Sequence, residues 1–225
     1  MKSRQEIKAL AKQAMAQQRG TSILILVLLF LVIVAIALFV LIPIPIVGYV
    51  IYTAGLILVM PLVVNVEGAF LKIYQGETVT VGEPFSELGV NYARKLGGMW
   101  WMMLFYWLWS MLLFVPGFIK LIAYSMTPFI LASCPDVPAK RALKLSMIMT
   151  KGHKGKLFVL MLSFIGWMLL AGLTIGILGI VHVGPYYYTS YAGFYAELRD
   201  NAIASGLIDP AELGMAAAGN STLPV

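Results

Sequence analysis

Residues 21–42 read TSILILVLLFLVIVAIALFVLI, a run without a single charged side chain. About 20 apolar residues in a helix are enough to cross the hydrocarbon core of a bilayer. The run is longer than the apolar region of a secretory signal peptide, and no cleavage site with small residues follows it. The stretch therefore predicts a membrane-spanning helix that is retained in the protein, and it decides the fold class.

The composition of the chain agrees with a membrane setting. Of its 225 residues, 60% are hydrophobic and 12% are charged, whereas a soluble domain carries about 25% charged residues. A net charge of +6 is typical of basic cytoplasmic loops and does not indicate a nucleic-acid partner. The single cysteine, Cys134, excludes an internal disulfide and a cysteine cluster for a metal. We therefore expect no metal and no cofactor.

Five further apolar stretches extend the pattern along the chain. They lie at 47–66, 97–115 and 118–132, with two more inside 157–198. Turns with proline or glycine separate the paired stretches at 43–46, 116–117 and near 176–179, because proline lacks an N–H and restricts the residue before it. We predict an all-α fold, namely a polytopic membrane bundle of six transmembrane helices in three hairpins, plus cytoplasmic amphipathic helices.

The predicted domain organisation follows from these spans. Residues 1–20 form a cytoplasmic amphipathic N-terminal helix at the membrane interface, and Ser3 with Glu6 has the spacing of a capping box at its start. Residues 21–200 form the six-span transmembrane domain, with cytoplasmic loops at about 67–96 and 133–156. Residues 201–225 are predicted to be a flexible cytoplasmic tail.

The distribution of charge orients this bundle. With six spans, all ten acidic residues and fifteen of the sixteen Lys and Arg residues fall on the side that holds the N-terminus, and Lys120 alone falls on the other. Cytoplasmic loops are enriched in Lys and Arg. Both termini are therefore predicted to lie in the cytoplasm, and the opposite side carries only short turns.

The basic segment 137–156 contains the first candidate binding site. On a helical wheel Lys140, Lys144 and Lys151 share a narrow arc, with apolar residues opposite. This pattern is typical of a helix that lies on a bilayer with its cations toward anionic headgroups. The candidates for binding anionic membrane lipids or a partner membrane protein are Lys140, Arg141, Lys144, Lys151, Lys154 and Lys156. The alternative interpretation is a basic anchor that only sets the topology.

Polar residues of the second and sixth predicted spans form a second candidate site. They are Asn65, Glu67, Tyr187, Tyr191 and Glu197. Ionisable side chains within spans are costly and often functional, so these residues define a candidate polar path through the bundle. Pro61 and Pro128 mark helix breaks of the kind that transporters use. The alternative is a cytoplasmic layer of salt bridges with Lys72, Arg94 or Arg199.

Motifs that would indicate an enzyme do not occur in the sequence. There is no nucleophile elbow, no phosphate-binding glycine loop, no zinc-binding helix motif and no pair of intramembrane aspartates. We therefore expect no enzymatic activity. The leading hypothesis is a membrane protein that binds lipid or a partner membrane protein at its basic cytoplasmic face. The alternative hypothesis is a transporter or channel for a small solute or lipid.

The second half of the chain carries a series of family motifs. In order they are PGFIK at 116–120, YSMTPFILA at 124–132, GHK at 152–154, LFVL at 157–160, LSFIGW at 162–167, PYY at 185–187, YA at 191–192 and YAEL at 195–198. Together they resemble a bacterial family of integral membrane proteins known as domain-of-unknown-function family 975. The resemblance implies a multi-span fold in a bacterial plasma membrane and no particular activity. The chain departs from the family near Ser133 and at Met161, where the family usually has acidic residues.

Overall fold

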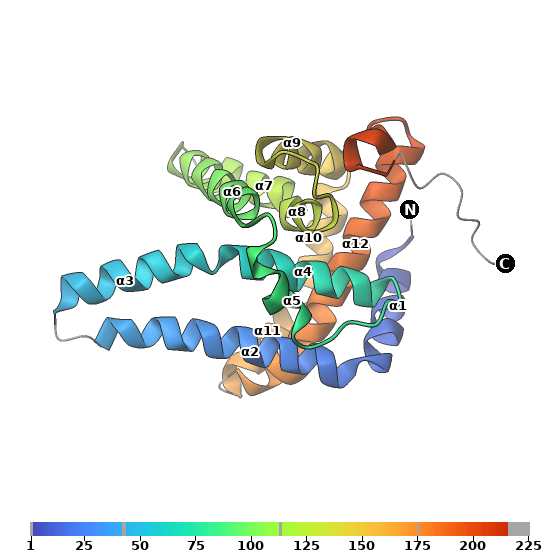
Figure 1. Ribbon diagram of the computed structural model, residues 1–225. Coiled ribbons are helices and arrows are strands. Elements are labelled where there is room, and N and C mark those ends of the chain that lie inside the picture. The colour runs from blue at the N-terminus through green and yellow to red at the C-terminus, as the bar shows by residue number, and fades with distance from the viewer. Residues whose placement is uncertain (1, 42–43, 113, 175, 216–225) are drawn as a thin grey trace.

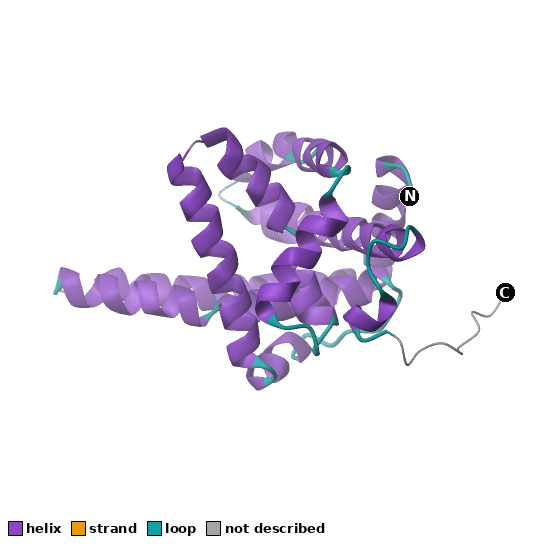
Figure 2. Ribbon diagram, turned by 90° about the horizontal axis from the view of Figure 1, so that it is seen from above, coloured by secondary structure: helices purple, strands orange, loops and turns teal. Residues whose placement is uncertain are grey.

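The computed structural model describes residues 2–41, 44–112, 114–174 and 176–215 (Figure 1). Every regular element in these ranges is helical, and no strand occurs among them (Figure 2). The first elements are α1 (Arg4–Gln17), α2 (Arg19–Ala37), η1 (Leu38–Leu41), α3 (Pro45–Leu58), α4 (Met60–Tyr74), α5 (Glu83–Ser86) and η2 (Glu87–Gly89). They are followed by α6 (Tyr92–Leu112), α7 (Phe114–Tyr124), α8 (Thr127–Ser133), α9 (Ala139–Thr150), α10 (Lys154–Leu162), α11 (Ile165–Leu173), η3 (Gly179–Val183), α12 (Gly184–Ala204) and η4 (Pro210–Leu213). The prediction of an all-α fold is confirmed.

Three helical stretches are long and apolar enough to cross a membrane. They are Arg19–Leu41, Ile46–Tyr74 and Lys154–Leu173, which join α2 to η1, α3 to α4 and α10 to α11. The first of them, Arg19–Leu41, contains nearly all of the uncharged run at residues 21–42. Helices of this length and composition indicate a membrane protein.

Both predicted helix breaks occur at proline. α3 gives way to α4 just before Pro61, and α7 gives way to α8 just before Pro128. In each case the proline lies in the first turn of the new helix. Proline is tolerated there because the N–H that it lacks has no partner within the helix, whereas further along its ring clashes with the carbonyl four residues earlier.

Two predicted boundaries are wrong. α4 continues to Tyr74, so residues 67–74 are helical and do not belong to a loop. Pro116 and Gly117 lie inside α7, so the predicted turn does not occur at these residues. Residue 113, between α6 and α7, lies outside the described residues. The predicted turn at 43–46 also falls partly outside them. The positions of the turns were misjudged because a proline within the first turn of a helix resembles a proline that ends one.

The core is organised around α12, which packs against α1, α2, α4 and α9 (Figure 1). All side chains of α12 from Thr189 to Ala196 are buried. α4 approaches closely because Gly193 lies against the ring of Tyr74, where any Cβ would collide with the ring. Small residues at helix contacts are the usual means of close packing between membrane helices. α2 and α3 lie side by side and extend well beyond this core (Figure 1).

The N-terminal helix begins as its sequence predicts. Ser3 accepts a hydrogen bond from the backbone of Glu6, and the Glu6 carboxylate accepts one from the Ser3 backbone, which completes a capping box. Its apolar side chains Ile7, Ala11 and Met15 are buried, because α1 packs on α12 and α4. The apolar face therefore packs against protein, and the prediction that it lies on a bilayer is wrong.

The predicted flexible tail is ordered in its first part. α12 continues to Ala204, and Ile208 and Leu213 beyond it are buried in the main core. Arg141 of α9 forms two hydrogen bonds to the Glu212 carboxylate, at 2.7 and 2.8 Å. Residues up to 215 thus belong to the fold. Residues 216–225 lie outside the described part of the chain.

Candidate functional site

α9, which carries the predicted basic face, is attached to the protein through its apolar side. Ala142 and Leu145 are fully buried, and α9 packs on α6, α7, α8 and α12. Buried Ser146 accepts a hydrogen bond from the Met126 backbone and donates one to the Ala123 carbonyl, at 3.2 and 2.7 Å. These two backbone groups lie at the break between α7 and α8, so Ser146 of α9 supplies hydrogen-bond partners that the broken helix lacks. The prediction that this apolar face rests on lipid is wrong.

The six predicted basic residues do not form one surface. Lys140 and Lys144 point from α9 into a pocket, and Arg141 is paired with Glu212. Lys151 lies beyond the end of α9. Lys154 and Lys156 belong to α10, and Lys156 lines a different hollow beside Lys2 and Arg4. Gly152, with a φ of +82°, changes the chain direction between the two groups.

We call the pocket beside α9 the lysine–tryptophan pocket. Its volume is about 350 Å³, and its lining consists of Trp101, Phe105, Trp109, Lys120, Tyr124, Lys140, Leu143, Lys144 and Met147. The Lys140 ammonium lies 4.5 Å from the centre of the Trp101 ring, and that of Lys120 lies 4.7 Å from the Trp109 ring. Ammonium groups at such distances are attracted to the faces of the rings.

The charges of the lysine–tryptophan pocket are all positive. Its lining contains three lysines and no acidic residue. None of the three pairs with a carboxylate among the described residues. Leu104 and Leu108, which follow Trp101 and Phe105 by three residues and so lie next to them on the surface of α6, are exposed. The pocket thus combines uncompensated positive charge with neighbouring apolar surface.

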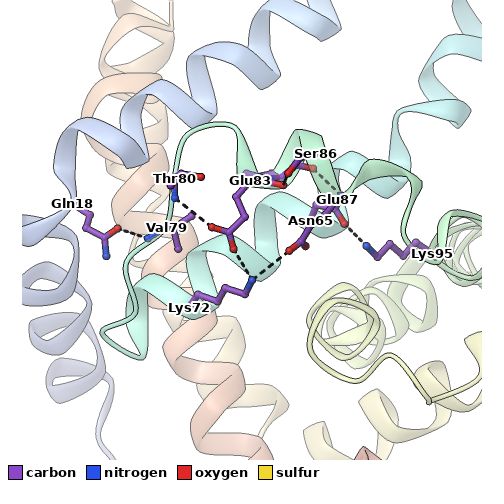
Figure 3. Close-up of polar contacts among 10 residues, drawn as sticks. Gln18, Asn65, Lys72, Val79, Thr80, Glu83, Ser86, Glu87 and Lys95 are labelled. Atoms are coloured by element: carbon purple, nitrogen blue, oxygen red, sulfur yellow. Dashed lines mark hydrogen bonds and ion pairs between the residues drawn. The ribbon is translucent and has the colours of Figure 1, made fainter.

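A second cavity, of about 370 Å³, lies between α4, α5, η2, α6, α8 and the end of α12. We call it the Lys95 pocket. Its charged lining consists of Lys72, Lys95, Arg199, Glu77, Glu83 and Glu87. Figure 3 shows several of these side chains converging from α4, from the 77–89 segment and from the start of α6.

Lys95 is the most deeply buried cation of this pocket, with 5% of its surface exposed. Its ammonium donates to Asn65 Oδ1 at 2.5 Å, and the Asn65 amide donates to the Pro84 carbonyl at 2.8 Å (Figure 3). Burial lowers the pKa of Lys95, and the nearby Glu87 carboxylate partly opposes this shift. Asn65, predicted as part of a path through the bundle, therefore belongs to the Lys95 pocket.

The other residues of the predicted polar path are divided. Tyr187 and Tyr191 of α12 stack on each other with ring centres 5.4 Å apart, and Glu67 belongs to α4, which packs against α12. One Glu67 carboxylate oxygen is buried and has no hydrogen-bond partner among the described residues. Glu197 lies elsewhere and pairs with Lys2 at 2.8 Å, a contact that raises the pKa of Lys2.

The predicted salt-bridge layer has different partners from those expected. Lys72 pairs with Glu83 at 2.6 Å and with Glu87 at 3.6 Å, and Arg199 pairs with its neighbour Asp200. Arg94 donates to the carbonyls of three residues that end α8 and begin the following loop, namely Leu131, Cys134 and Val137. Arg94 therefore caps a helix terminus whose carbonyls have no partner within the helix.

Several residues of the two pockets escaped the sequence analysis. Lys120 was predicted on the opposite face from the other basic residues, yet it lines the same pocket as Lys140 and Lys144. Trp101 and Trp109 were recognised only as part of a span. Their spacing of eight residues, about two helical turns, places both rings on one face and is the signal that points to a shared pocket.

No group of three or more metal-ligating side chains occurs among the residues that the structure describes. The lysine–tryptophan pocket offers only cations, aromatic rings and apolar groups. Such a lining suits an anionic amphiphile, since it can hold a charged headgroup and an apolar chain together.

The fold thus defines an all-helical protein with three helices able to span a membrane. The chain belongs to the family described as a protein of unknown function (DUF975), whose model matches residues 85–202, more than half of the chain. The match confirms the resemblance seen in the second half and extends it to include α6. It contains the whole lining of the lysine–tryptophan pocket. No curated protein and no solved structure matches the chain.

Proposed function

We propose that this chain is a non-enzymatic protein of the bacterial cytoplasmic membrane that binds an anionic lipid in the lysine–tryptophan pocket. The observation that carries the proposal is the convergence of Lys120, Lys140 and Lys144 on a lining without any acidic residue. A phosphate headgroup there meets three ammonium groups, and its acyl chains lie along the exposed apolar face of α6.

The proposal includes the arrangement in the membrane. In it, six helical segments cross the bilayer as three hairpins, with both termini in the cytoplasm. The three long apolar helices supply part of this arrangement, and α6 with its close neighbour α7 supplies a further hairpin. Lys140 lies beside Trp101, the tenth residue of α6. The proposal assigns Lys140 and Lys144 to the cytoplasmic side of this helix, because tryptophan and lysine are favoured near the membrane interface.

Two substitutions at the pocket test the proposal. The double variant Lys140→Gln with Lys144→Gln is expected to weaken retention of phosphatidylglycerol about thirtyfold, because each lysine near an anionic headgroup contributes about 1 kcal/mol. Native mass spectrometry of the detergent-purified protein, titrated with equal amounts of phosphatidylglycerol and phosphatidylcholine, measures the bound fraction of each lipid.

The chain provides a matched control for net charge. The triple variant Lys151→Gln, Lys154→Gln and Lys156→Gln removes more charge but touches no residue of the pocket. It is expected to change phosphatidylglycerol retention by less than about twofold. If both variants lose the lipid equally, binding depends on net charge and not on the pocket. If neither loses it, the proposal is wrong.

The alternative of a transport path requires the five polar residues to face one cavity. Asn65 lies in the Lys95 pocket and Glu197 is paired with Lys2. Tyr187 and Tyr191 stack on each other on α12, and Glu67 lies on α4, which packs against that helix. Asn65 and Glu197 thus have separate surroundings, and this separation favours lipid binding as the proposed function.

A further inference from the structure

The Lys95 pocket takes no part in the proposed lipid site. It is lined by other residues and, α6 excepted, by other elements. Its lining carries three cations and three carboxylates, whereas the lysine–tryptophan pocket carries cations only. The Lys95 pocket therefore suits a ligand that carries both positive and negative charge.

The charges of the Lys95 pocket outside the Lys72–Glu83 ion pair lie at different depths. Lys95 is 5% exposed, and the side chain of Arg199 is 15% exposed. The side chain of Glu87 is 46% exposed, and Glu77 is also exposed. Lys95 and Arg199 thus lie deeper than Glu87 and Glu77. The side chains of Lys72 and Glu83, which are 40% and 24% exposed, neutralise each other in an ion pair.

The buried Lys95 ammonium has fewer hydrogen-bond partners than it has N–H donors. An ammonium group has three N–H donors, and Asn65 is the one hydrogen-bond acceptor that the described residues offer to Lys95 (Figure 3). No carboxylate among the described residues is close enough to form an ion pair with it. A buried charge without a counter-ion is strongly unfavourable, so an anion beside Lys95 would relieve this energy.

Lys72, another cation of the pocket, is already paired with carboxylates. Lys72 holds Glu83 at 2.6 Å and Glu87 at 3.6 Å. Glu83 also accepts a hydrogen bond from the Thr80 backbone, which fixes it to the wall of the pocket. Lys95 therefore remains to meet an incoming anion, because Arg199 is paired with Asp200. Glu77 pairs with no cation among the described residues and lies at the open end beside Glu87, whose contact with Lys72 is the longer of the two.

We propose that the Lys95 pocket binds a small zwitterion, with a phosphate or carboxylate group beside Lys95 and an ammonium group beside Glu77 and Glu87. The charged lining sums to zero, so a bare anion gains at the buried end and loses at the open end. A molecule with both charges gains at each end, because its dipole opposes that of the pocket.

Phosphoethanolamine is a suitable probe, because inorganic phosphate and ethanolamine represent its two halves. Phosphoethanolamine, inorganic phosphate and ethanolamine are titrated separately into the delipidated protein in phosphate-free buffer. The melting temperature is followed by tryptophan fluorescence. Binding to the folded state raises the melting temperature by mass action. Phosphoethanolamine is expected to give a saturable rise, half-complete at a concentration at least tenfold below that needed for phosphate. Ethanolamine is expected to give none.

Substitutions assign the two ends of the ligand. Lys95→Gln keeps a donor for Asn65 but removes the cation, and should raise the half-saturating concentration of phosphoethanolamine at least tenfold. Glu87→Gln, at an exposed position, should reduce phosphoethanolamine to the level of phosphate. Lys151→Gln, outside both pockets, should have no effect.

The proposal is overturned if phosphoethanolamine gives no saturable rise in the melting temperature of the wild-type protein, or if inorganic phosphate gives an equal rise. An unchanged response in both pocket variants would also overturn it. Added phosphatidylethanolamine then identifies the source of the ligand, since it competes if the site takes a lipid headgroup and does not compete if the site takes a soluble molecule. Phosphatidylglycerol retention, measured in parallel, reports separately on the lysine–tryptophan pocket.

Discussion

Replacing Arg94 by methionine is expected to lower the apparent melting temperature of the protein by about 6–12 °C. The guanidinium donates to three carbonyls at the end of α8, at 2.5, 3.2 and 2.8 Å. Removing this partly buried charged donor leaves the Leu131 and Val137 carbonyls without their donor, whereas the Cys134 carbonyl keeps a hydrogen bond from the Val137 backbone. The loss costs about 3 kcal/mol. In a chain of this length each kcal/mol shifts the melting temperature by about 2–4 °C.

The reactivity of Cys134 reports whether the loss of stability in Arg94→Met is localised to the end of α8. Cys134 is the only cysteine of the chain and is buried, and its own carbonyl is one of the three that Arg94 binds. In Arg94→Met the end of α8 should open locally, so a thiol-reactive dye should label Cys134 faster at temperatures well below melting. Arg94→Lys, which keeps the charge without the planar fork, should lose about half as much stability.

Arg141→Gln is the matched control for this prediction. Its salt bridge to Glu212 has both side chains 40% exposed, and exposed pairs contribute at most about 1 kcal/mol. The melting temperature should therefore fall by less than about 4 °C, and Cys134 should stay protected. Equal effects of Arg94→Met and Arg141→Gln would show that the carbonyl contacts contribute nothing.

Gly117→Ala is expected to destabilise the contact between α6 and α7. A Cβ at this position would lie 2.6 Å from Ser110 Oγ and 2.8 Å from Ser110 Cα. The Cα is backbone and cannot rotate away, so the two helices must separate, at a cost of about 1–3 kcal/mol. Because the lysine–tryptophan pocket lies between these helices and α9, phosphatidylglycerol retention should fall as well.

Gly97→Ala provides the comparison within α6. A Cβ there meets no atom within 4 Å, and alanine is a better helix former than glycine by about 1 kcal/mol. This variant should be as stable as the wild type or more so. Tryptophan fluorescence is a suitable readout, since four of the five tryptophans lie on α6. If both glycine variants melt at the wild-type temperature, the close contact at Gly117 is not needed for stability.

Features that depend on nearby residues could be predicted from the sequence. The all-helical class follows from apolar runs of membrane-spanning length, and the breaks before Pro61 and Pro128 follow from the missing N–H of proline. The capping box of Ser3 and Glu6 joins atoms three residues apart. The motifs of the second half were sufficient to recognise the family, which the match over residues 85–202 confirms.

The tertiary structure decided which surface each helix covers. The apolar faces of α1 and α9 were assigned to the bilayer, but both pack on other helices. The sequence could not distinguish these outcomes, because lipid chains and protein interiors are equally apolar environments for such a face. The same holds for charge. Lys120 joins Lys140 in one pocket and Arg94 reaches the end of α8, because these partners are brought together only when distant segments pack, and no local spacing encodes that packing.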